Sequence, residues 1–451
     1  MQPMSIVEQK AQFEDLVTQA LTYARSLGAT DATAEVSKGQ GLSVSVRMGS
    51  LETVEQTRGG ALGVTVYAGQ RRGSASTSDF SRQAIEQTVE AAWSIARYTA
   101  DDDMAGLPDV EDLFLEPAID LSLYHPWSVE VDEATEIALK AETAARDLDP
   151  RIANTEGASV STGESQFVLA NSRGFMNGYS TTRHSISVVP IAGRGDGMQR
   201  DFWYSSQRNA KDLSDPVQLG QYAAERALSR LDARRLSTRQ APVIFEAPLA
   251  LGLLGALTQA LSGGALYRKA SFLEGSLGQQ VLADHISVDE NPFIPGAFGS
   301  SLFDNEGVRT RARQVISAGE VQNYFLSTYT AKKLGMRTTG HAGGSHNLVL
   351  RSRDTQAHHT LDWMLKEMGT GLLVTELIGQ GVNYVTGDYS RGAFGYWVEN
   401  GEIQYPVEEI TIAGNLKEMF LRMAAVGSDE LIRGGKRTGS ILIPEMSIAG
   451  T

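Results

Sequence analysis

Hydrophobic residues change their spacing several times along this chain, and the order of these changes constrains the fold most. Over residues 13–27 they recur at helical spacing. Over 42–46 they alternate with polar residues, which is typical of a half-buried strand. Further strands at 61–68 and 73–77 precede a second helical pattern over 81–98. The order helix, strands, helix predicts an α+β unit.

The central part of the chain repeats this order. A helix is predicted from Asp132, a suitable N-cap residue, and strands follow over 152–189. A helix over 216–231 ends the segment. The acidic stretch 101–112, which contains Pro and Gly, is interpreted as the linker between the two units.

The C-terminal half is predicted to consist mainly of strands and turns. The turns SAGE (317–320) and ENGE (399–402) indicate two hairpins, and short helices are predicted over 248–261, 361–368 and 416–426. Many strands joined by Gly-rich turns favour a curled sheet or barrel. We therefore predict three domains: an α+β domain over 1–110, a second α+β domain over 111–235, and a β-rich, barrel-like domain over 236–451.

Charge argues against nucleic acid as a partner. The chain has 54 acidic and 40 basic side chains, a formal net charge of −14, and such a field repels phosphate. The basic clusters at 71–72, 234–235 and 433–437 are short, and we interpret them as solvated surface.

Composition also limits location and chemistry. The 451 residues include no cysteine, which excludes disulfides, thiolate-bound zinc and thiol catalysis. The N-terminal residues 1–12 show no signal-peptide pattern, and no apolar run is long enough to span a membrane. We expect a cytoplasmic protein with no membrane partner.

Several polar groups are candidates for chemistry. His341 and His346 lie in the Gly-rich stretch GHAGGSHN, and with Glu376 or Asp388 they form a candidate metal site. His358 and His359 are adjacent and therefore poorly placed to grip one ion. His184 with Ser185 and Asp196 or Asp201 allows a nucleophilic triad, but no nucleophile elbow accompanies it.

The stretch GDYSRGA, Gly387 to Ala393, lies between two strand-like runs and is predicted to be a loop. One interpretation is a hairpin loop closed by an Asp–Arg pair. The other is a loop whose residues Asp388, Tyr389 and Arg391 line a substrate chamber or contact a partner. The sequence leaves both open.

Long motifs point to a known family. They include GALGVTVYAGQRRGSAS from Gly60, GFMNGYSTTRHS from Gly174, FDNEGVRT from Phe303 and MGTGLLVTELIGQGVNYVTGDYSRGAFGYWVENGEIQYPVEEITIAGN from Met368. Along nearly its whole length the chain resembles the TldD/PmbA family of peptidases.

The resemblance is to one branch of that family. The metal-bearing TldD branch carries an H-E-x-x-x-H helix where this chain has LGLLGALTQALSG, 251–263. The three corresponding positions are Gly255, Ala256 and Ala260, none of which can bind zinc or activate water. Cysteine, which supplies a further zinc ligand in that branch, is absent. Together with GDYSRGA, this makes the chain similar to the PmbA (TldE) branch, with no metal and no catalytic residue of its own.

The resemblance implies a function shared between two chains. A TldD-like subunit would supply zinc and hydrolysis, and this chain would complete a cytoplasmic metallopeptidase that degrades or trims unfolded peptides, including microcin precursors and antitoxins. Asp388, Tyr389, Arg391 and His341 are then candidates for the substrate chamber or the interface. A homodimer remains open for the isolated chain. Two alternatives remain: an interaction protein that modulates DNA gyrase without proteolysis, and an independent homomeric hydrolase that uses His341 and His346.

Overall fold

The computed structural model describes residues 9–450 and divides into two compact units. The first unit contains the chain up to Leu231 together with Leu302–Arg309, and the second contains Asp232–Ser301 and the chain from Thr310 onward. Of the N-terminal segment considered for a signal peptide, residues 1–8 lie outside the described range.

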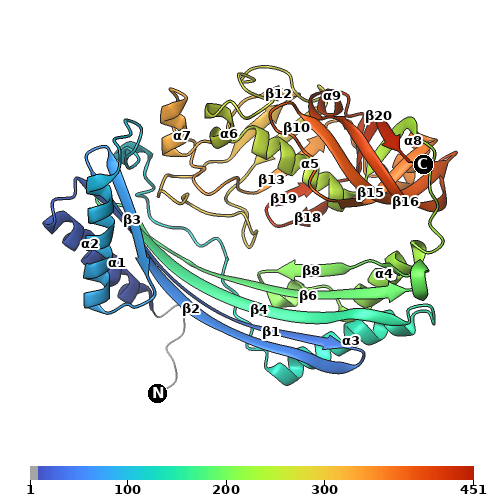
Figure 1. Cartoon of the computed structure of the whole chain (residues 1–451), viewed down its shortest axis with the longest axis horizontal. Coiled ribbons are helices and arrows are strands. Elements are labelled where there is room, and N and C mark those ends of the chain that lie inside the picture. Colours follow the sequence, from blue (N-terminus) through green and yellow to red (C-terminus); the bar gives the residue numbers. More distant parts are fainter. Residues whose placement is uncertain (1–8, 451) are drawn as a thin grey trace. The chain divides into compact units, whose positions relative to one another are not determined.

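The first unit is built on one eight-stranded sheet with the order β3-β2-β1-β4-β6-β7, to which β5 and β8 add through β4 and β6. The strands are β1 Asp31–Arg47, β2 Ser50–Ala68, β3 Arg71–Thr77, β4 Asn154–Asn171, β5 Met176–Asn177, β6 Ser180–Ala192, β7 Gln199–Arg200 and β8 Trp203–Gln207. The long strands curve along their length (Figure 1). The predicted order, helix–strands–helix twice, is confirmed, and the antiparallel pairing of β1 with β4 joins the strands of both segments in a single sheet.

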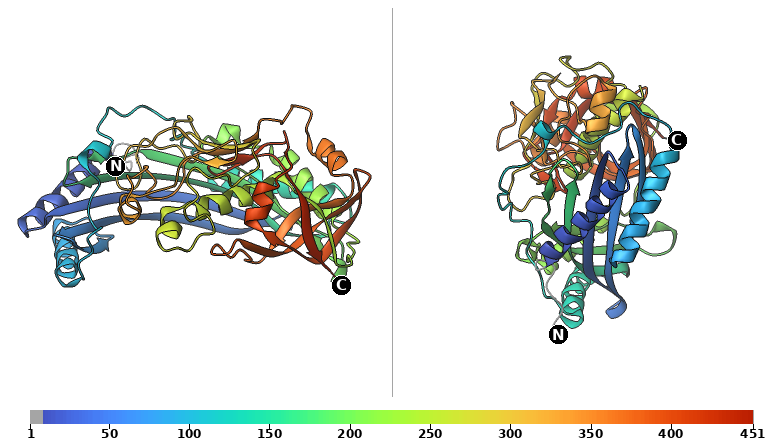
Figure 2. Two further views of the ribbon diagram at one scale, coloured as in Figure 1. Left: turned by 90° about the horizontal axis from the view of Figure 1, so that it is seen from above. Right: turned by 90° about the vertical axis from the view of Figure 1, so that its left-hand side faces the viewer.

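Four helices cover this sheet at two places. They are α1 Lys10–Ser26, α2 Arg82–Tyr98, α3 Val131–Asp147 and α4 Pro216–Ser229, with short 3-10 turns at Val110–Asp112, Gly195–Gly197 and Ala210–Asp212. On β1, Ala34 and Val36 are buried with α1 and α2, while Val44 and Val46 are buried with α3 and α4. These positions have the same parity and therefore share one face of the strand. Figure 2 shows α1 and α2 at one end of the long strands.

Two helix boundaries illustrate the local signals. Ser81 caps α2, and its side chain accepts a hydrogen bond from the amide of Ala84. The prediction that Asp132 caps α3 is wrong, because Glu130 precedes that helix and Asp132 lies in its first turn. An acidic residue there still interacts favourably with the helix dipole.

The short segment 302–309 completes a small core of the first unit. Phe303 packs against Phe175, with ring centroids 5.0 Å apart, and both are buried with Leu113. Nη2 of Arg309 donates a hydrogen bond to the carbonyl of Leu113. This core explains why a segment from the C-terminal half of the sequence belongs to the first unit.

The second unit contains two sheets. One has the order β16-β15-β14-β9-β20-β17, and the other β12-β11-β10-β13-β19-β18. Their strands are β9 Arg239–Phe245, β10 Ile286–Glu290, β11 Arg313–Ser317, β12 Glu320–Val321, β13 Leu348–Ser352, β14 Gly371–Ile378, β15 Asp388–Glu399, β16 Glu402–Asn415, β17 Ala425–Val426, β18 Leu431–Arg433, β19 Lys436–Thr438 and β20 Ile441–Ala449. Because β16 pairs with both β15 and β20, five strands close into a barrel. The predicted barrel-like, β-rich C-terminal region is confirmed.

Helices α5 Ala247–Ala260, α6 Gly263–Tyr267, α7 Thr328–Lys333, α8 Leu361–Met368 and α9 Leu416–Leu421 complete this unit. Both predicted hairpins are present. Asn400 and Gly401 have φ values of 55° and 78°, as a type I′ turn requires. Helix α9 ends earlier than predicted because residues 425–426 form a strand instead.

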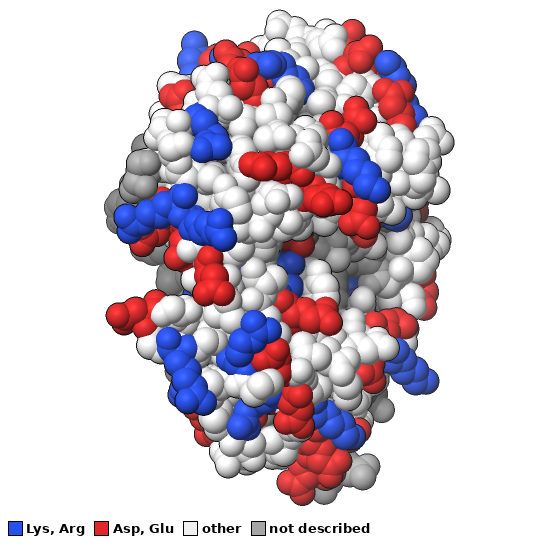
Figure 3. Space-filling model, turned by 90° about the vertical axis from the view of Figure 1, so that its right-hand side faces the viewer, with Lys and Arg blue, Asp and Glu red and all other residues white. Residues whose placement is uncertain are grey.

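Surface and hydropathy add two observations. Within residues 9–450, no helix is long and apolar enough to cross a membrane. On the face shown in Figure 3, Lys and Arg side chains are interspersed with Asp and Glu. For the described residues visible on that face, no broad area of positive charge is present to attract a phosphate backbone.

Candidate functional site

The helix α5 carries the positions at which the metal-bearing branch has its ligands. It begins directly after β9, with Pro248 in its first turn, where the missing amide of proline has no cost. Ala250, Leu254 and Leu257 are buried and form an apolar stripe along the helix. Packing of this stripe into the core fixes which face of the helix points outward.

The three motif positions do not share one environment. Ala256 and Ala260 are buried in the core of the second unit, with 5% and 0% of their surface exposed. Gly255 instead lines a cleft. None of the three has a side-chain donor atom, so the helix offers no ligand for zinc and no base for water.

The cleft beside Gly255 has a volume of about 590 Å³ and lies entirely within the second unit. Thr258 and Gln259 of α5 form one wall, and the loop 341–345 and Lys436 of β19 form others. Cε of Lys436 lies 3.9 Å from the point where a Cβ on Gly255 would stand. An ammonium-bearing side chain therefore lies beside the first motif position.

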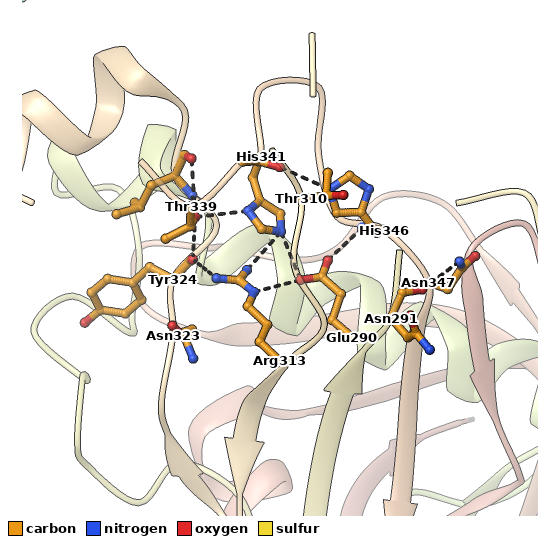
Figure 4. A network of polar contacts seen from close by, with 12 residues as sticks. Glu290, Asn291, Thr310, Arg313, Asn323, Tyr324, Thr339, His341, His346 and Asn347 are labelled. Atoms are coloured by element: carbon orange, nitrogen blue, oxygen red, sulfur yellow. Dashed lines mark hydrogen bonds and ion pairs between the residues drawn. The ribbon is translucent and has the colours of Figure 1, made fainter. Parts of the chain in front are cut away.

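One wall of the cleft rests on a buried polar network, shown in Figure 4. Glu290 ends β10, and its side chain is 0% exposed. Its carboxylate accepts hydrogen bonds from Nε of Arg313 at 2.8 Å and from the amide of His346 at 2.7 Å. Nε2 of His341 lies 2.9 Å from the same carboxylate. Such a set of donors stabilises an ionised buried carboxylate.

Other polar atoms of the network also have neighbours within this chain. Nη1 of Arg313 donates to the carbonyl of Tyr324 at 3.0 Å, and Nη2 lies 3.0 Å from Nε2 of His341. Nδ1 of His341 lies 3.0 Å from Oγ1 of Thr339. Both ring nitrogens of His341 are therefore occupied by neighbours of this chain.

Burial and charge shift the titration of this network. Burial alone would raise the pKa of Glu290, but hydrogen bonding by His341 and the charge of Arg313 outweigh it and hold that pKa at about 2. Burial lowers the pKa of His341 to about 4, and the hydrogen bond and charge of Glu290, which raise it, offset this only in part. At neutral pH the network contains a carboxylate, a guanidinium and a neutral imidazole.

The network does not fit a metal ion. Nε2 of His346 lies 3.0 Å from the carbonyl of Gly340, to which it donates, so it presents no lone pair. Nε2 of His341 lies 3.0 Å from Nη2 of Arg313. The positive charge of that guanidinium repels a cation. Among residues 9–450, no group of three or more His, Asp or Glu side chains is arranged to hold a metal.

The other histidine candidates are also engaged in structural roles. Nε2 of His184 lies 2.8 Å from the carbonyl of His125, and Nδ1 lies 2.8 Å from Oγ1 of Thr162. The hydroxyl of Ser185 forms a hydrogen bond with the hydroxyl of Ser161 on the neighbouring strand and none with His184. The candidate nucleophilic triad therefore does not form. The rings of His358 and His359 are nearly perpendicular, and His359 stacks on Trp363.

The stretch GDYSRGA is not a loop. From Asp388 onward it belongs to β15, which pairs with both β14 and β16. Asp388 forms hydrogen bonds with Thr386 and Asn415, so the predicted Asp–Arg pair does not form. These side chains are not in the lining of the cleft beside Gly255, whereas His341 is.

Polar atoms of β15 are left without partners. The hydroxyl of Tyr389 and Nε of Arg391 are buried and have no hydrogen-bond partner within the described chain. Burial raises the pKa of Tyr389 to about 12, although Arg391 partly opposes this. Buried polar atoms without a hydrogen-bond partner are uncommon in folded proteins.

Three residues of the site were not predicted from the sequence. Glu290 follows the buried residues Ile286 and Val288 at a spacing of two, so alternation alone would have placed this carboxylate on the inner face of β10. Arg313, on a neighbouring strand, had no comparable signal. The sequence groups Lys436 with the 433–437 cluster, which is interpreted as solvated surface, but this residue is half-buried in the cleft.

Comparisons with known proteins agree with the resemblance. Residues 32–96 match PmbA/TldA metallopeptidase domain 1, residues 124–231 match the central domain, and residues 238–450 match the C-terminal domain. The chain is 50% identical to the metalloprotease PmbA of Escherichia coli O157:H7, over 100% of this chain and 99% of that protein. It is 48% identical to a PmbA homologue of Haemophilus influenzae, over 98% and 97% of the two chains.

Solved structures show the same fold. A candidate modulator of DNA gyrase from Bacteroides thetaiotaomicron superposes with a TM-score of 0.92 at 28% identity, covering 98% of this chain and 100% of that one. TldE of Thermococcus kodakarensis has a TM-score of 0.83 over 97% and 99% of the chains, and at 20% identity it supports the fold alone. With domain matches along most of the chain and half of its residues shared with a PmbA protein, this chain belongs to the PmbA/TldD family of metallopeptidases.

Proposed function

We propose that this chain is the subunit without its own metal in a two-chain metallopeptidase, and that a related TldD-like chain supplies zinc and the catalytic base. The observation that carries this proposal is the helix α5. Gly255, Ala256 and Ala260 provide no ligand, and Lys436 lies beside the first of them. Both ring nitrogens of His341 and Nε2 of His346 have partners within the chain.

The strand β15 is the part of this chain that we assign to the partner or the shared substrate chamber. Buried atoms of Tyr389 and Arg391 have no partner within the described residues. Gly392, which follows Arg391 in β15, pairs with Ile378 of β14. The side chains of Ile378 and Val385 are each 57% exposed. Exposed apolar side chains next to unsatisfied polar atoms favour contact with another chain.

We propose that the substrates are short or unfolded peptides and that the complex acts in the cytoplasm. The family description as metallopeptidases and the absence of cysteine in this chain support these statements. Without its partner, the chain is expected to use the same surface for a homodimer, since related chains commonly pair about a twofold axis.

The proposal predicts that restoring the three motif residues does not make this chain an active peptidase. A variant carrying Gly255→His, Ala256→Glu and Ala260→His remains inactive by itself, because two of these positions are packed in the core and cannot hold larger polar groups without strain. A peptide-cleavage assay of the purified variant checks this. Chelator-sensitive cleavage at a rate comparable with that of the two-chain complex would contradict it.

The Bacteroides protein is named as a modulator of DNA gyrase, which favours a second candidate function. In this alternative, the chain binds DNA gyrase without proteolysis. A pull-down with the tagged chain separates the two. Recovery of a TldD-like chain supports the peptidase subunit. Recovery of gyrase in cells that lack any TldD-like chain supports the alternative.

A further inference from the structure

We propose that the cleft beside Gly255 binds the free α-carboxylate of a peptide through Lys436. This inference rests on the proposed function, since a peptidase complex exposes this chain to peptide substrates and products. The cleft volume of about 590 Å³ is in the range of sites that enclose small ligands.

The first argument is charge. The residues that line the cleft include no Asp or Glu, although the whole chain has a formal net charge of −14. Lys436 is the one lining residue, within the described chain, that is charged at neutral pH, because burial lowers the pKa of His341 well below neutrality. Behind His341, the charges of Glu290 and Arg313 compensate each other at 2.8 Å. The cleft therefore presents one positive charge.

The second argument is the absence of a partner for that charge. Lys436 is half-buried, yet within residues 9–450 its ammonium group forms no ion pair and no hydrogen bond. Its neighbour Arg437 forms an ion pair with Glu430 on the adjacent loop. Of these two cations of β19, Arg437 therefore has a counter-charge within the chain and Lys436 has none among the described residues. An ammonium without a counter-charge in its own chain is available to a ligand carboxylate, and hydrogen bonds between charged groups are among the strong ones.

The third argument is the other hydrogen-bond donors that line the cleft. Most hydroxyls of the cleft are used internally: Thr258 donates to the carbonyl of Leu254, and Ser262 donates to that of Gln259. The side chains of Gln259 and Ser345 line the cleft and form no hydrogen bond within the described chain. One ammonium, one amide and one hydroxyl match a carboxylate, whose two oxygens accept several hydrogen bonds.

The fourth argument is space. At Gly255, the nearest atom lies 3.9 Å from the point where a Cβ would stand, so the helix leaves the floor of the cleft open. Gly343 and Gly344, in the facing loop, have φ values of 107° and 116°, which disfavour other residues. Gly255, Gly343 and Gly344 therefore leave part of each wall without side chains.

The test uses the isolated full-length chain and ligand-observed nuclear magnetic resonance, with N-acetylated tetra-alanine as the probe. We expect the free acid to bind and the C-terminal amide to bind at least about tenfold more weakly. Lys436→Met lowers affinity for the free acid by a similar factor, whereas Lys417→Met, at an exposed position on α9, leaves it unchanged.

A second pair of variants blocks the cleft without removing the lysine. Gly255→Asp places a carboxylate beside Lys436 and abolishes binding of the free acid. Gly252→Asp, on the exposed side of the same helix, introduces the same residue with nothing within 4 Å of its Cβ and leaves binding intact. Circular dichroism of all four variants establishes that they are folded.

Several results would overturn the proposal. They are equal affinity for acid and amide, equal effects of Lys436→Met and Lys417→Met, or no binding by the folded chain at millimolar peptide. Tighter binding of inorganic phosphate than of peptide, or equal binding of an amidated peptide with a Glu side chain, would overturn the assignment to a C-terminal carboxylate. Peptidase activity of the two-chain complex, measured in parallel, separates failure of this inference from failure of the proposed function.

Discussion

Two polar regions of the second unit differ in how completely the chain satisfies them. Around Glu290, the carboxylate, the guanidinium of Arg313 and both ring nitrogens of His341 have neighbours within hydrogen-bond distance. On β15, buried atoms of Tyr389 and Arg391 have none within the described chain. The first region pairs its buried polar groups within the chain, whereas the second leaves two buried polar atoms without a hydrogen-bond partner in the described residues.

The largest expected effect comes from breaking the satisfied region. Glu290→Ala leaves Arg313 buried without a counter-charge and is expected to lower the free energy of unfolding by about 3–5 kcal/mol. Urea denaturation followed by fluorescence measures this. Glu402→Ala, at the exposed first residue of β16, serves as the control and should change stability little. Equal effects of the two substitutions would show that the network does not stabilise the fold.

The same network predicts a dependence of stability on pH. The pKa of His341 is about 4 in the folded chain and about 6.5 when unfolded, so the unfolded chain binds more protons in this window. Stability therefore falls as pH drops from about 6.5 to 4. Glu290 has a lowered pKa of about 2, so its contribution is present above about 4.5 and is lost toward pH 2.

Unfolding midpoints at pH 7 and pH 4.5 test the upper part of this window. In His341→Gln the difference between the two midpoints becomes smaller than in the unsubstituted chain, while in His358→Gln, at an exposed position, it stays the same. An unchanged difference in His341→Gln would show that this imidazole does not set the acid response.

Breaking the unsatisfied region is expected to change activity rather than stability. Arg391→Ala lowers peptide turnover by the two-chain complex by about tenfold, the effect of losing one hydrogen bond to a charged group. The unfolding midpoint of the isolated chain changes little. Arg353→Ala, whose guanidinium pairs with exposed Asp284, is the matched control. Full turnover with Arg391→Ala would remove β15 from the shared chamber.

The smallest expected effect sharpens the comparison. Tyr389→Phe removes a buried hydroxyl that has no partner within the described chain, so the stability of the isolated chain should change by no more than about 0.5 kcal/mol. Thr339→Val removes a hydroxyl that lies 3.0 Å from Nδ1 of His341 and should cost about 1–2 kcal/mol. If the two substitutions had equal costs, the contrast between the regions would not be energetic.

Much of the fold was predictable because local patterns agree with it. The helix over 361–368 and the hairpin at Asn400-Gly401 follow from spacing and turn chemistry. The pairing of β1 with β4 was not predictable, because the strands lie more than a hundred residues apart and periodicity gives no register between them. The glycines of GDYSRGA suggest a turn, but only Gly387 lies outside the strand, and β15 accommodates Gly392 between β14 and β16.

The candidate site was predictable in part. Gly255, Ala256 and Ala260 could be identified from the motif, but their separation into one cleft position and two core positions depends on how α5 packs. The partners of His341 come from β10 and β11, which lie far from it in the sequence. Lys436 could not be distinguished from its surface neighbours by charge alone.

The central claim, that this chain has no metal of its own and acts with a zinc-bearing relative, is tested most directly by one measurement. Zinc content and peptide cleavage are determined for the purified chain, for a TldD-like chain and for their mixture. We predict far less than one zinc per molecule of this chain, no cleavage by it alone, and chelator-sensitive cleavage by the mixture. About one tightly held zinc per chain together with chelator-sensitive cleavage by this chain alone would contradict the account.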